Sequence, residues 1–418
     1  MNEQFLHHLK QYADVLVRVG LNLQPGKRVL IMAPVTDDPI IRRLIHFASR
    51  KAYEAGASFV DALWNDPYMT RIHLEDAGDE HLGNYSSWRF DSLVDNIEND
   101  GGILSIGARD PNLLKGIAPE DIVAFQRPQN ARQQEIAHKR FSEGLGTSSI
   151  AIVSFQAWAD TVLPDVPEDE RVIQLWDIIF KTCRIDTDDP VAEWQSHKGA
   201  LIARCDTLNK RQFSALKFTA PGTDLTVGLP QNHIWVGGGV NSNAGVFYMP
   251  NIPTEEVFTV PHRDRVNGTV RASKPLAYSG SMIEDFSVTF KDGCVVDISA
   301  KSGGDLLREL VKTDDGAQRL GEVALVPNSS PISQTGLLFN NTLFDENAAN
   351  HVALGRAYPM TVAGGTEMSP ETLNAVGGNT SEIHVDFMIG SGEMDVDGIT
   401  AQGDAVPVMR DGEWAFDV

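Results

Sequence analysis

The first half of the chain alternates between patterns typical of helices and patterns typical of strands, and this alternation constrains the fold more than any other feature. Apolar residues recur near helical spacing over residues 6–19, and a short apolar run over 28–34 is typical of a buried strand. An amphipathic pattern over 37–55 predicts a second helix, and a second strand is expected over 57–64. Strands that alternate with helices in this way form parallel sheets covered by helices.

The same alternation continues to about residue 210. Further strands are expected over residues 101–106 and 147–155, and neither a phosphate-binding loop nor a G-x-G-x-x-G turn follows them. The pattern therefore gives little support to a nucleotide-binding protein. The remaining helices of this half are expected over residues 90–98, 113–125, 164–183 and 190–208.

Beyond about residue 211, short strands with turn signals replace the helices. Asp292-Gly293 separates two of these strands, and an Asp-Gly pair is a strong hairpin signal. One helix is expected over residues 303–311. The strands are expected over residues 215–218, 225–229, 234–237, 269–271, 286–291, 294–300 and 321–326. We therefore predict an α/β N-terminal domain with a parallel sheet over residues 1–210, followed by a mixed α+β, β-rich C-terminal catalytic domain over 211–418.

Charge and cysteine content narrow the functional classes. The 418-residue chain has a formal net charge of −22, which argues against nucleic acid or an anionic membrane as a partner, because both require basic patches. An apolar run over residues 29–35 is too short to cross a bilayer, and the N-terminus lacks the pattern of a signal peptide. The three cysteines include no C-x-x-C pair and predict neither a disulfide framework nor a cysteine zinc site. We expect a cytoplasmic protein.

Residues 378–389 combine a strand pattern with two side chains that bind metals. Apolar residues alternate with His384 and Asp386, so both polar side chains project from the same face of the predicted strand. A carboxylate on a half-buried strand is costly unless a cation compensates it. The pattern therefore indicates a metal site, and an exposed polar face is the alternative that these residues leave open.

Two other segments place carboxylates beside apolar strands. Glu255 and Glu256 follow Pro253, and in an extended segment only one of the two glutamates points inward. Glu322 opens the apolar strand expected over residues 321–326. The alternatives are a solvated acidic turn for the first segment and a solvated strand end for the second.

A fourth segment, LFDENAANHVALGRAYP, supplies a second histidine and a tyrosine. We expect Asp345 to cap a helix that continues to about residue 354, which places Asn347 and His351 on one face. Glu346 can face the same centre as His351 only where the chain bends, and Tyr358 follows the expected helix. A single histidine in such a helix is more often packed than ligating.

Taken together, these segments of one domain supply the ligands of a site for two divalent metals. Such sites use hard oxygen ligands, an imidazole for each metal and a bridging carboxylate. The sequence contains no H-E-x-x-H motif, so the pattern excludes a thermolysin-like site.

The same segments resemble the thermophilic aminopeptidase family M29. The resemblance rests on NIPTEEVFT, LGEVALV, LFDENAANHVALGRAYP and EIHVDFMIG, and it extends over nearly the whole chain, including PGKRVLI near the N-terminus. It implies a dimeric metal-dependent aminopeptidase with two divalent metal ions, which could be Zn, Co, Mn or Mg, acting on peptides with a free N-terminus. Neither nucleic acid nor a membrane is expected as a partner.

The resemblance also implies roles for individual residues. The metal ligands that it implies are Glu256, with Glu255 in reserve, Glu322 as the bridging carboxylate, His351, His384 and Asp386. The resemblance implies that Glu346 is a ligand or the general base. It implies that Tyr358 donates a hydrogen bond to the oxyanion of the tetrahedral intermediate. His262 has basic neighbours that would repel a cation, so a role near the substrate is the most that we expect of it.

Two other functions use the same residue types. One is a two-metal hydrolase of another class, such as an amidohydrolase or a phosphoesterase, although no basic phosphate clamp accompanies the ligands. The other is a non-catalytic binding protein stabilised by metal, which would need neither Glu346 nor Tyr358.

Overall fold

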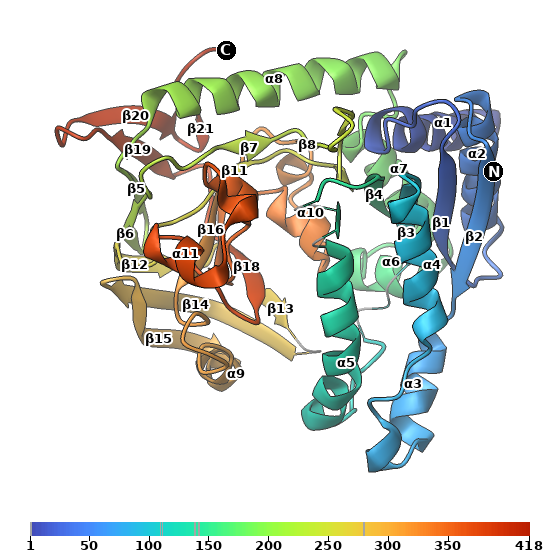
Figure 1. Cartoon of the computed structure of the whole chain (residues 1–418), viewed down its shortest axis with the longest axis horizontal. Coiled ribbons are helices and arrows are strands. Elements are labelled where there is room, and N and C mark those ends of the chain that lie inside the picture. The colour runs from blue at the N-terminus through green and yellow to red at the C-terminus, as the bar shows by residue number, and fades with distance from the viewer. Residues whose placement is uncertain (1, 109, 111, 138, 141–142, 279–280) are drawn as a thin grey trace. The chain divides into compact units, whose positions relative to one another are not determined.

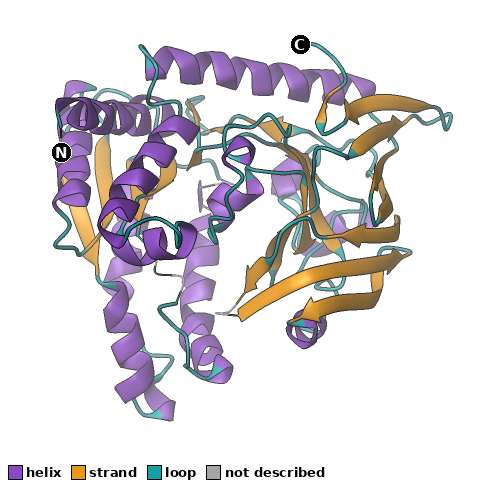
Figure 2. Cartoon of the chain, turned by 180° about the vertical axis from the view of Figure 1, so that it is seen from behind, coloured by secondary structure: helices purple, strands orange, loops and turns teal. Residues whose placement is uncertain are grey.

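The computed structural model describes the chain except for residues 1, 109, 111, 138, 141–142 and 279–280. The described chain forms two compact units. The first comprises Met1–His197 and Gly239–Pro253, and the second comprises Lys198–Gly238 and Thr254–Val418. Figure 1 labels the elements along the chain, and Figure 2 shows helices gathered in the first unit and strands in the second.

The first unit contains a parallel sheet. Among the described residues it has five strands in the order β10-β4-β3-β1-β2, and every neighbouring pair is parallel. The predicted parallel sheet is therefore confirmed. The strands are β1 Arg28–Pro34, β2 Phe59–Asn65, β3 Gly102–Gly107, β4 Thr147–Ile152 and β10 Asn251–Ile252. A separate pair, β8 Val240–Asn241 and β9 Phe247–Tyr248, forms a short antiparallel ribbon.

Helices alternate along the chain with the strands of this sheet, as the sequence pattern predicts. Two of them were not expected, α3 and α6, and α5 begins later and extends further than the expected 113–125. Three acidic residues in the first turn of α7 favour its start, because they interact with the positive end of the helix dipole. The helices are α1 Glu3–Val15, α2 Pro39–Glu54, α3 Pro67–Asp76, α4 Ser87–Glu98, α5 Pro119–Ala137, α6 Gln156–Val162, α7 Glu168–Thr182 and α8 Pro190–Arg211.

The second unit consists mainly of two antiparallel sheets, which confirms a β-rich C-terminal region. One sheet has the order β18-β17-β16-β11-β7, and the other runs β13-β14-β12-β6-β5-β19-β20-β21 with β15 paired to β14. The strands of the first sheet are β7 Val236–Gly237, β11 Val257–Thr259, β16 Leu320–Leu325, β17 His351–Gly355 and β18 His384–Met388. Those of the second are β5 Ala215–Ala220, β6 Thr223–Gly228, β12 Val266–Arg271, β13 Leu276–Tyr278, β14 Ser281–Lys291, β15 Cys294–Ser302, β19 Asp395–Ile399, β20 Ala405–Arg410 and β21 Glu413–Trp414.

The two sheets of the second unit share one hydrophobic core. The rings of Phe286 on β14 and Phe387 on β18 lie 5.4 Å apart, and both side chains are fully buried. The predicted hairpin is confirmed, since β14 and β15 turn at Asp292-Gly293, where both residues have positive φ. Among the described residues, the unit also contains the part of α8 from Lys198 onward and the helices α9 Gly304–Leu310, α10 Thr342–Glu346 and α11 Pro370–Ala375.

The compact units divide the chain differently from the single boundary predicted near residue 210. The first change of unit falls within α8, and Gly239–Pro253 returns to the first unit because β10 pairs with β4. Pairing with a strand so distant in sequence leaves no local signal. No helix in the described parts of the chain is long and apolar enough to cross a membrane.

Candidate metal centre

Three neighbouring strands carry most of the predicted ligands on one face of a sheet. Glu322 on β16 pairs with Ala353 on β17, which pairs in turn with Asp386 on β18. His351 and His384 each lie two residues from a member of this row, so their side chains project to the same side. The small side chain of Ala353 separates the two carboxylates, which leaves room above the sheet for the imidazoles.

The side chains on this face lie close together. His351 Nε2 is 3.0 Å from Glu256 Oε2 and 3.5 Å from Glu322 Oε1. On the other side, His384 Nε2 is 3.7 Å from Glu322 Oε2 and 3.6 Å from Asp386 Oδ2. Each carboxylate oxygen of Glu322 therefore faces a different imidazole.

The structure separates the two neighbouring glutamates before β11. Glu256 joins Glu322 and His351 in a group whose ligand atoms all lie within 4.8 Å of one another. Glu255 is also buried, but its carboxylate interacts with Arg204 on α8, where it opposes the lowering of the Arg204 pKa by burial. The geometry thus places Glu256 in the cluster and leaves Glu255 outside this group.

Glu346 reaches the cluster from α10, which packs beside β18 (Figure 1). Burial raises the pKa of Glu346 well above its usual value, and the charges of Glu256 and Asp386 raise it further. Tyr358 follows β17, and its ring lies 4.8 Å from the ring of His384. Burial, with the charges of Glu322 and Asp386, likewise raises the pKa of Tyr358.

The expected helix from Asp345 to about residue 354 is wrong. The short helix α10 ends at Glu346, and the chain enters β17 at His351. Asp345 is not the N-cap, which is Asn341, and its carboxylate instead accepts hydrogen bonds from the backbone of Phe339 and Asn341. Strand pairing on both sides of β17 overrides the local helical spacing. Glu322 also lies within its strand rather than at a solvated end.

Both histidines are oriented for ligation. His351 Nδ1 lies 3.0 Å from the carbonyl oxygen of Ala349, and His384 Nδ1 lies 2.7 Å from that of Arg356. Only a protonated Nδ1 can donate to a carbonyl, so in the neutral tautomer Nε2 carries a lone pair toward the carboxylates. Metal-binding histidines are held in this way, with the other ring nitrogen bonded to a carbonyl or carboxylate.

The surroundings of the clustered carboxylates favour the binding of a cation. Burial, together with the charges of Asp386 and Glu256, raises the pKa of Glu322 to about 7, although His351 opposes the shift. Burial alone would lower the pKa of His351, but its contacts with Glu256 and Glu322 raise it well above the usual value. Within the described residues, no hydrogen-bond donor reaches Glu322 Oε2 or Asp386 Oδ1, although both atoms are buried. These donor atoms fit divalent metal ions, which accept carboxylate oxygen and imidazole nitrogen.

Sequence reasoning missed Arg204 beside the cluster, and it expected Asn347 only to share a helix face with His351. Arg204 interacts with Glu255, and the side chain of Asn347 accepts a hydrogen bond from the Glu255 backbone at 2.7 Å. Both contacts join segments far apart in sequence, so no local pattern marks them. His262 lies outside the group formed by Glu256, Glu322 and His351, and its Nδ1 accepts a hydrogen bond from the backbone of Asp264.

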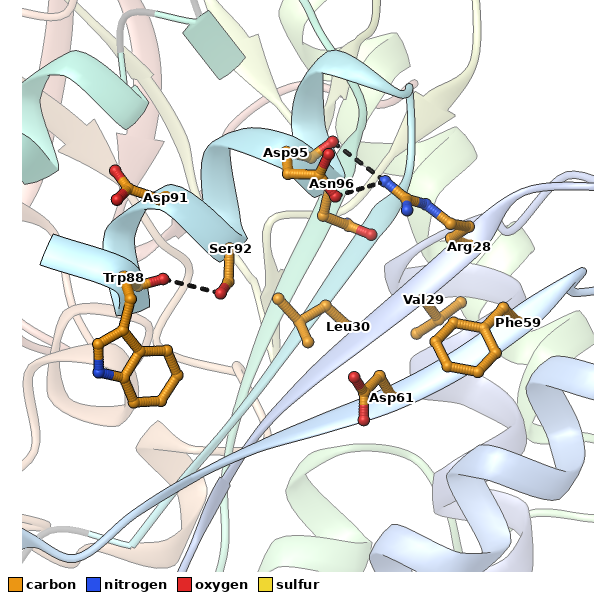
Figure 3. Close-up of a pocket in the computed structure, with 10 residues that line it drawn as sticks. All are labelled: Arg28, Val29, Leu30, Phe59, Asp61, Trp88, Asp91, Ser92, Asp95 and Asn96. Atoms are coloured by element: carbon orange, nitrogen blue, oxygen red, sulfur yellow. Dashed lines mark hydrogen bonds and ion pairs between the residues drawn. The ribbon is translucent and has the colours of Figure 1, made fainter.

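A pocket of about 470 Å³ in the first unit is a different kind of site (Figure 3). Asp91 and Asp95 reach it from α4, beside the exposed ring of Trp88, and Asp61 reaches it from β2. Asp95 pairs with Arg28 at 2.9 Å and Asp91 pairs with Arg132 at 2.7 Å. Two of the three acidic side chains that line the pocket therefore already have cationic partners.

Comparisons with known proteins agree with this geometry. A family profile described as thermophilic metalloprotease (M29) matches residues 5–414. Aminopeptidase 2 of Geobacillus stearothermophilus is 44% identical over 412 residues, with 98% of each chain covered. Aminopeptidase T of Thermus aquaticus is 42% identical over 414 residues, covering 99% of this chain and 100% of the relative. A solved structure, wild-type AmpT from Thermus thermophilus, superimposes with a TM-score of 0.92 at 40% identity, covering 99% of this chain and all of that chain.

Proposed function

The chain belongs to the M29 family of thermophilic metalloproteases and is a metallo-aminopeptidase, and we propose that it uses two divalent metal ions to release N-terminal residues from peptides. This proposal rests on one structural observation. Two histidines turn Nε2 toward the carboxylates of Glu256, Glu322 and Asp386, and the last two each have a buried oxygen without a hydrogen-bond donor among the described residues. Bound cations would stabilise such a group of donors in its charged form.

The positions of the side chains suggest how two ions would be held. Glu256 and His351 would bind one ion, and His384 and Asp386 the other. Glu322 would bridge them, because its two oxygens lie 3.5 and 3.7 Å from different imidazoles. The oxygen and nitrogen donors suit Zn, Co, Mn or Mg.

Bound divalent ions would supply a Lewis acid and would lower the pKa of a bound water from 15.7 toward ~7. The remaining chemistry belongs to the side chains. Glu346, buried beside the cluster, would accept a proton from the attacking water and deliver it to the leaving amine. A general base of this kind needs a raised pKa, and the surroundings of Glu346 provide one.

Tyr358 would donate a hydrogen bond to the oxyanion that develops from the substrate carbonyl. Its raised pKa keeps the phenol protonated at neutral pH, so the hydroxyl hydrogen remains available. The cluster is also rich in carboxylates that can receive the cationic amine of a free peptide N-terminus. We propose that this contact restricts cleavage to the first peptide bond.

An assay with paired substrates tests the function. The protein is stripped with a chelator, reloaded separately with Zn, Co, Mn or Mg, and given aminoacyl-p-nitroanilides with free or acetylated amines. We expect cleavage of the free-amine substrates only after a metal is restored, and no cleavage of the acetylated ones. Equal cleavage of both, or cleavage of a phosphate ester instead, would favour a two-metal hydrolase of another class.

Two further properties are proposed rather than established. We propose a homodimer, in keeping with the first unit's exposed apolar side chains: Tyr68 is 53%, Met69 60% and Trp88 54% exposed. Light scattering coupled to size-exclusion chromatography tests the oligomeric state.

We also propose that the protein is cytoplasmic. None of the three cysteines, all of which lie in described parts of the chain, forms a disulfide.

A further inference from the structure

Asn347 occupies a buried position between two segments that carry metal-centre carboxylates. Its side chain is fully buried, and it forms the C-cap of α10 directly after Glu346. On its other side lies the segment that leads into β11 and bears Glu255 and Glu256. The side chain of Asn347 contacts both segments.

The hydrogen bonds determine the orientation of this amide. The backbone N–H of Glu255 donates to Asn347 Oδ1 at 2.7 Å, and Asn347 Nδ2 donates to the carbonyl oxygen of Leu343 at 2.8 Å. A backbone N–H can only donate and a carbonyl can only accept, so a flipped amide would lose both bonds. Asn347 Nδ2 also lies 3.5 Å from Glu346 Oε1.

The residue itself is anchored. Ser330 Oγ donates to the backbone carbonyl of Asn347 at 2.8 Å, and Ser330 is also buried. Three hydrogen bonds therefore hold Asn347 in place. Ser330 binds its backbone carbonyl, Oδ1 accepts from the Glu255 backbone, and Nδ2 donates to the Leu343 carbonyl on α10. None of these bonds uses a side-chain atom of a proposed ligand, apart from the long contact with Glu346.

We propose that Asn347 is a positioning residue of the metal centre, whose side-chain amide sets the separation between the segment bearing Glu256 and the helix bearing Glu346. This inference rests on the proposed function, because it assumes that these carboxylates hold or serve metal ions. Metal sites tolerate little displacement of their ligands, and outer partners that orient ligands typically contribute 10–100-fold to metal affinity.

If Asn347 served only to fill the core, its substitution would give a different result. Loss of a buried asparagine that only fills the core lowers the free energy of unfolding without changing the coordination of a metal. Asn96 provides the matched control, because it is 5% exposed and its Nδ2 donates to the carbonyl of Gly102 at 2.9 Å in the first unit. Asn96→Ala removes a comparable buried amide far from any proposed ligand in sequence.

The experiment uses Co²⁺ as the probe on the full chain. Wild type, Asn347→Ala and Asn96→Ala are stripped of metal. The Co²⁺ dissociation constant is then measured by competition with a chromophoric chelator. The visible absorption spectrum of the cobalt-loaded protein and the melting temperature of the metal-free protein are recorded alongside. If Asn347→Ala does not fold, Asn347→Asp replaces it, because Asp keeps an acceptor for the Glu255 N–H while it replaces the donor to α10 with a charged oxygen beside Glu346; its readout is the cobalt spectrum.

We expect Asn347→Ala to weaken Co²⁺ binding by about 10–100-fold and to alter the cobalt spectrum. Asn96→Ala should lower the melting temperature and leave the Co²⁺ affinity and spectrum as in the wild type. Unchanged cobalt binding and spectrum in the Asn347 variant, or equal changes in the Asn96 variant, would overturn the inference alone. A wild-type protein that binds no Co²⁺ would overturn the proposed function, and the inference with it.

Discussion

Nε2 of His351 lies 3.0 Å from Oε2 of Glu256, so an imidazole on β17 faces a carboxylate from the segment that precedes β11. Both side chains are buried, and the opposite ring nitrogen of His351 is turned to a backbone carbonyl. His351 and Glu256 therefore direct a nitrogen lone pair and a carboxylate oxygen to the same point, which is the geometry of two ligands of one ion. Five predictions follow from this arrangement and its counterpart around His384.

Removal of the proposed bridging carboxylate should release metal. Glu322→Ala takes away the only residue whose two oxygens face both imidazoles, as far as the described residues show. We expect elemental analysis to find at least one metal ion fewer per chain than in the wild type. Glu309→Ala, an exposed glutamate on α9 paired with Lys312, is the control and should keep the full content. An unchanged metal content in Glu322→Ala would reject the bridging role.

Tyr358→Phe should separate turnover from metal binding. The substitution removes the hydroxyl that is proposed to donate to the oxyanion, but it keeps the ring that packs against His384. Loss of one such donor costs roughly 2.7–4 kcal/mol, so kcat should fall by about 10²–10³-fold while the metal content is unchanged. Tyr53→Phe, at an exposed tyrosine on α2, serves as the control. Full turnover by Tyr358→Phe would show that the hydroxyl has no such role.

The two adjacent glutamates should behave differently. Glu256→Gln removes a charged ligand beside His351 and should weaken metal binding. Glu255→Gln should keep the metal, because the contact between Glu255 and Asn347 uses the backbone N–H rather than the carboxylate. Isothermal titration of both variants with Co²⁺ measures the difference. Equal losses of affinity would show that the assignment to Glu256 is wrong.

The stability of the metal-free protein should fall as pH rises. Burial and neighbouring charges raise the pKa of Glu322 from 4.5 to about 7, so the folded state binds this proton more tightly than the unfolded state. Such a group stabilises the fold below pH 4.5, and its contribution is lost as pH rises from 4.5 through 7. The raised pKa of His351 acts in the same direction, with loss of stability from the unfolded value of 6.5 upward.

Differential scanning calorimetry between about pH 5 and pH 8 tests this dependence. The melting temperature of the metal-free wild type should decrease across the range, and Glu322→Gln should decrease less because it carries no titrating carboxyl. Added metal should stabilise the wild type most at the upper end of the range, where the ligands are deprotonated. A metal-free protein whose melting temperature rises with pH would contradict the account.

Strands β1 and β3 of the parallel sheet could be predicted because they are largely buried and read as apolar runs, as residues 28–34 do. α3 was not predicted, and the helix expected over 113–125 ends well before α5 does, in both cases for a physical reason. α3 exposes Tyr68, Met69 and Ile72, so its apolar residues do not mark a buried face. α5 contains Pro128 in its interior, where a proline usually signals the end of a helix.

In the candidate site, too, features that depend on local sequence could be predicted and those that depend on distant pairing could not. His384 and Asp386 could be placed on one face because strand periodicity is a local property, and β18 has that periodicity. His351 was assigned to a helix because β17 is buried throughout and shows no alternation. Its conformation depends on pairing with β16 and β18, which only the folded sheet supplies. The same holds for Asn347, whose partner Glu255 lies far away in the sequence.

The central claim is that one cluster holds two divalent ions on either side of Glu322. Anomalous diffraction from crystals of the cobalt-loaded protein, collected at the cobalt absorption edge, tests it most directly. We predict two anomalous peaks, one between Glu256 and His351 and the other between His384 and Asp386, both in contact with Glu322. A single peak, or peaks that avoid these side chains, would contradict the two-metal centre.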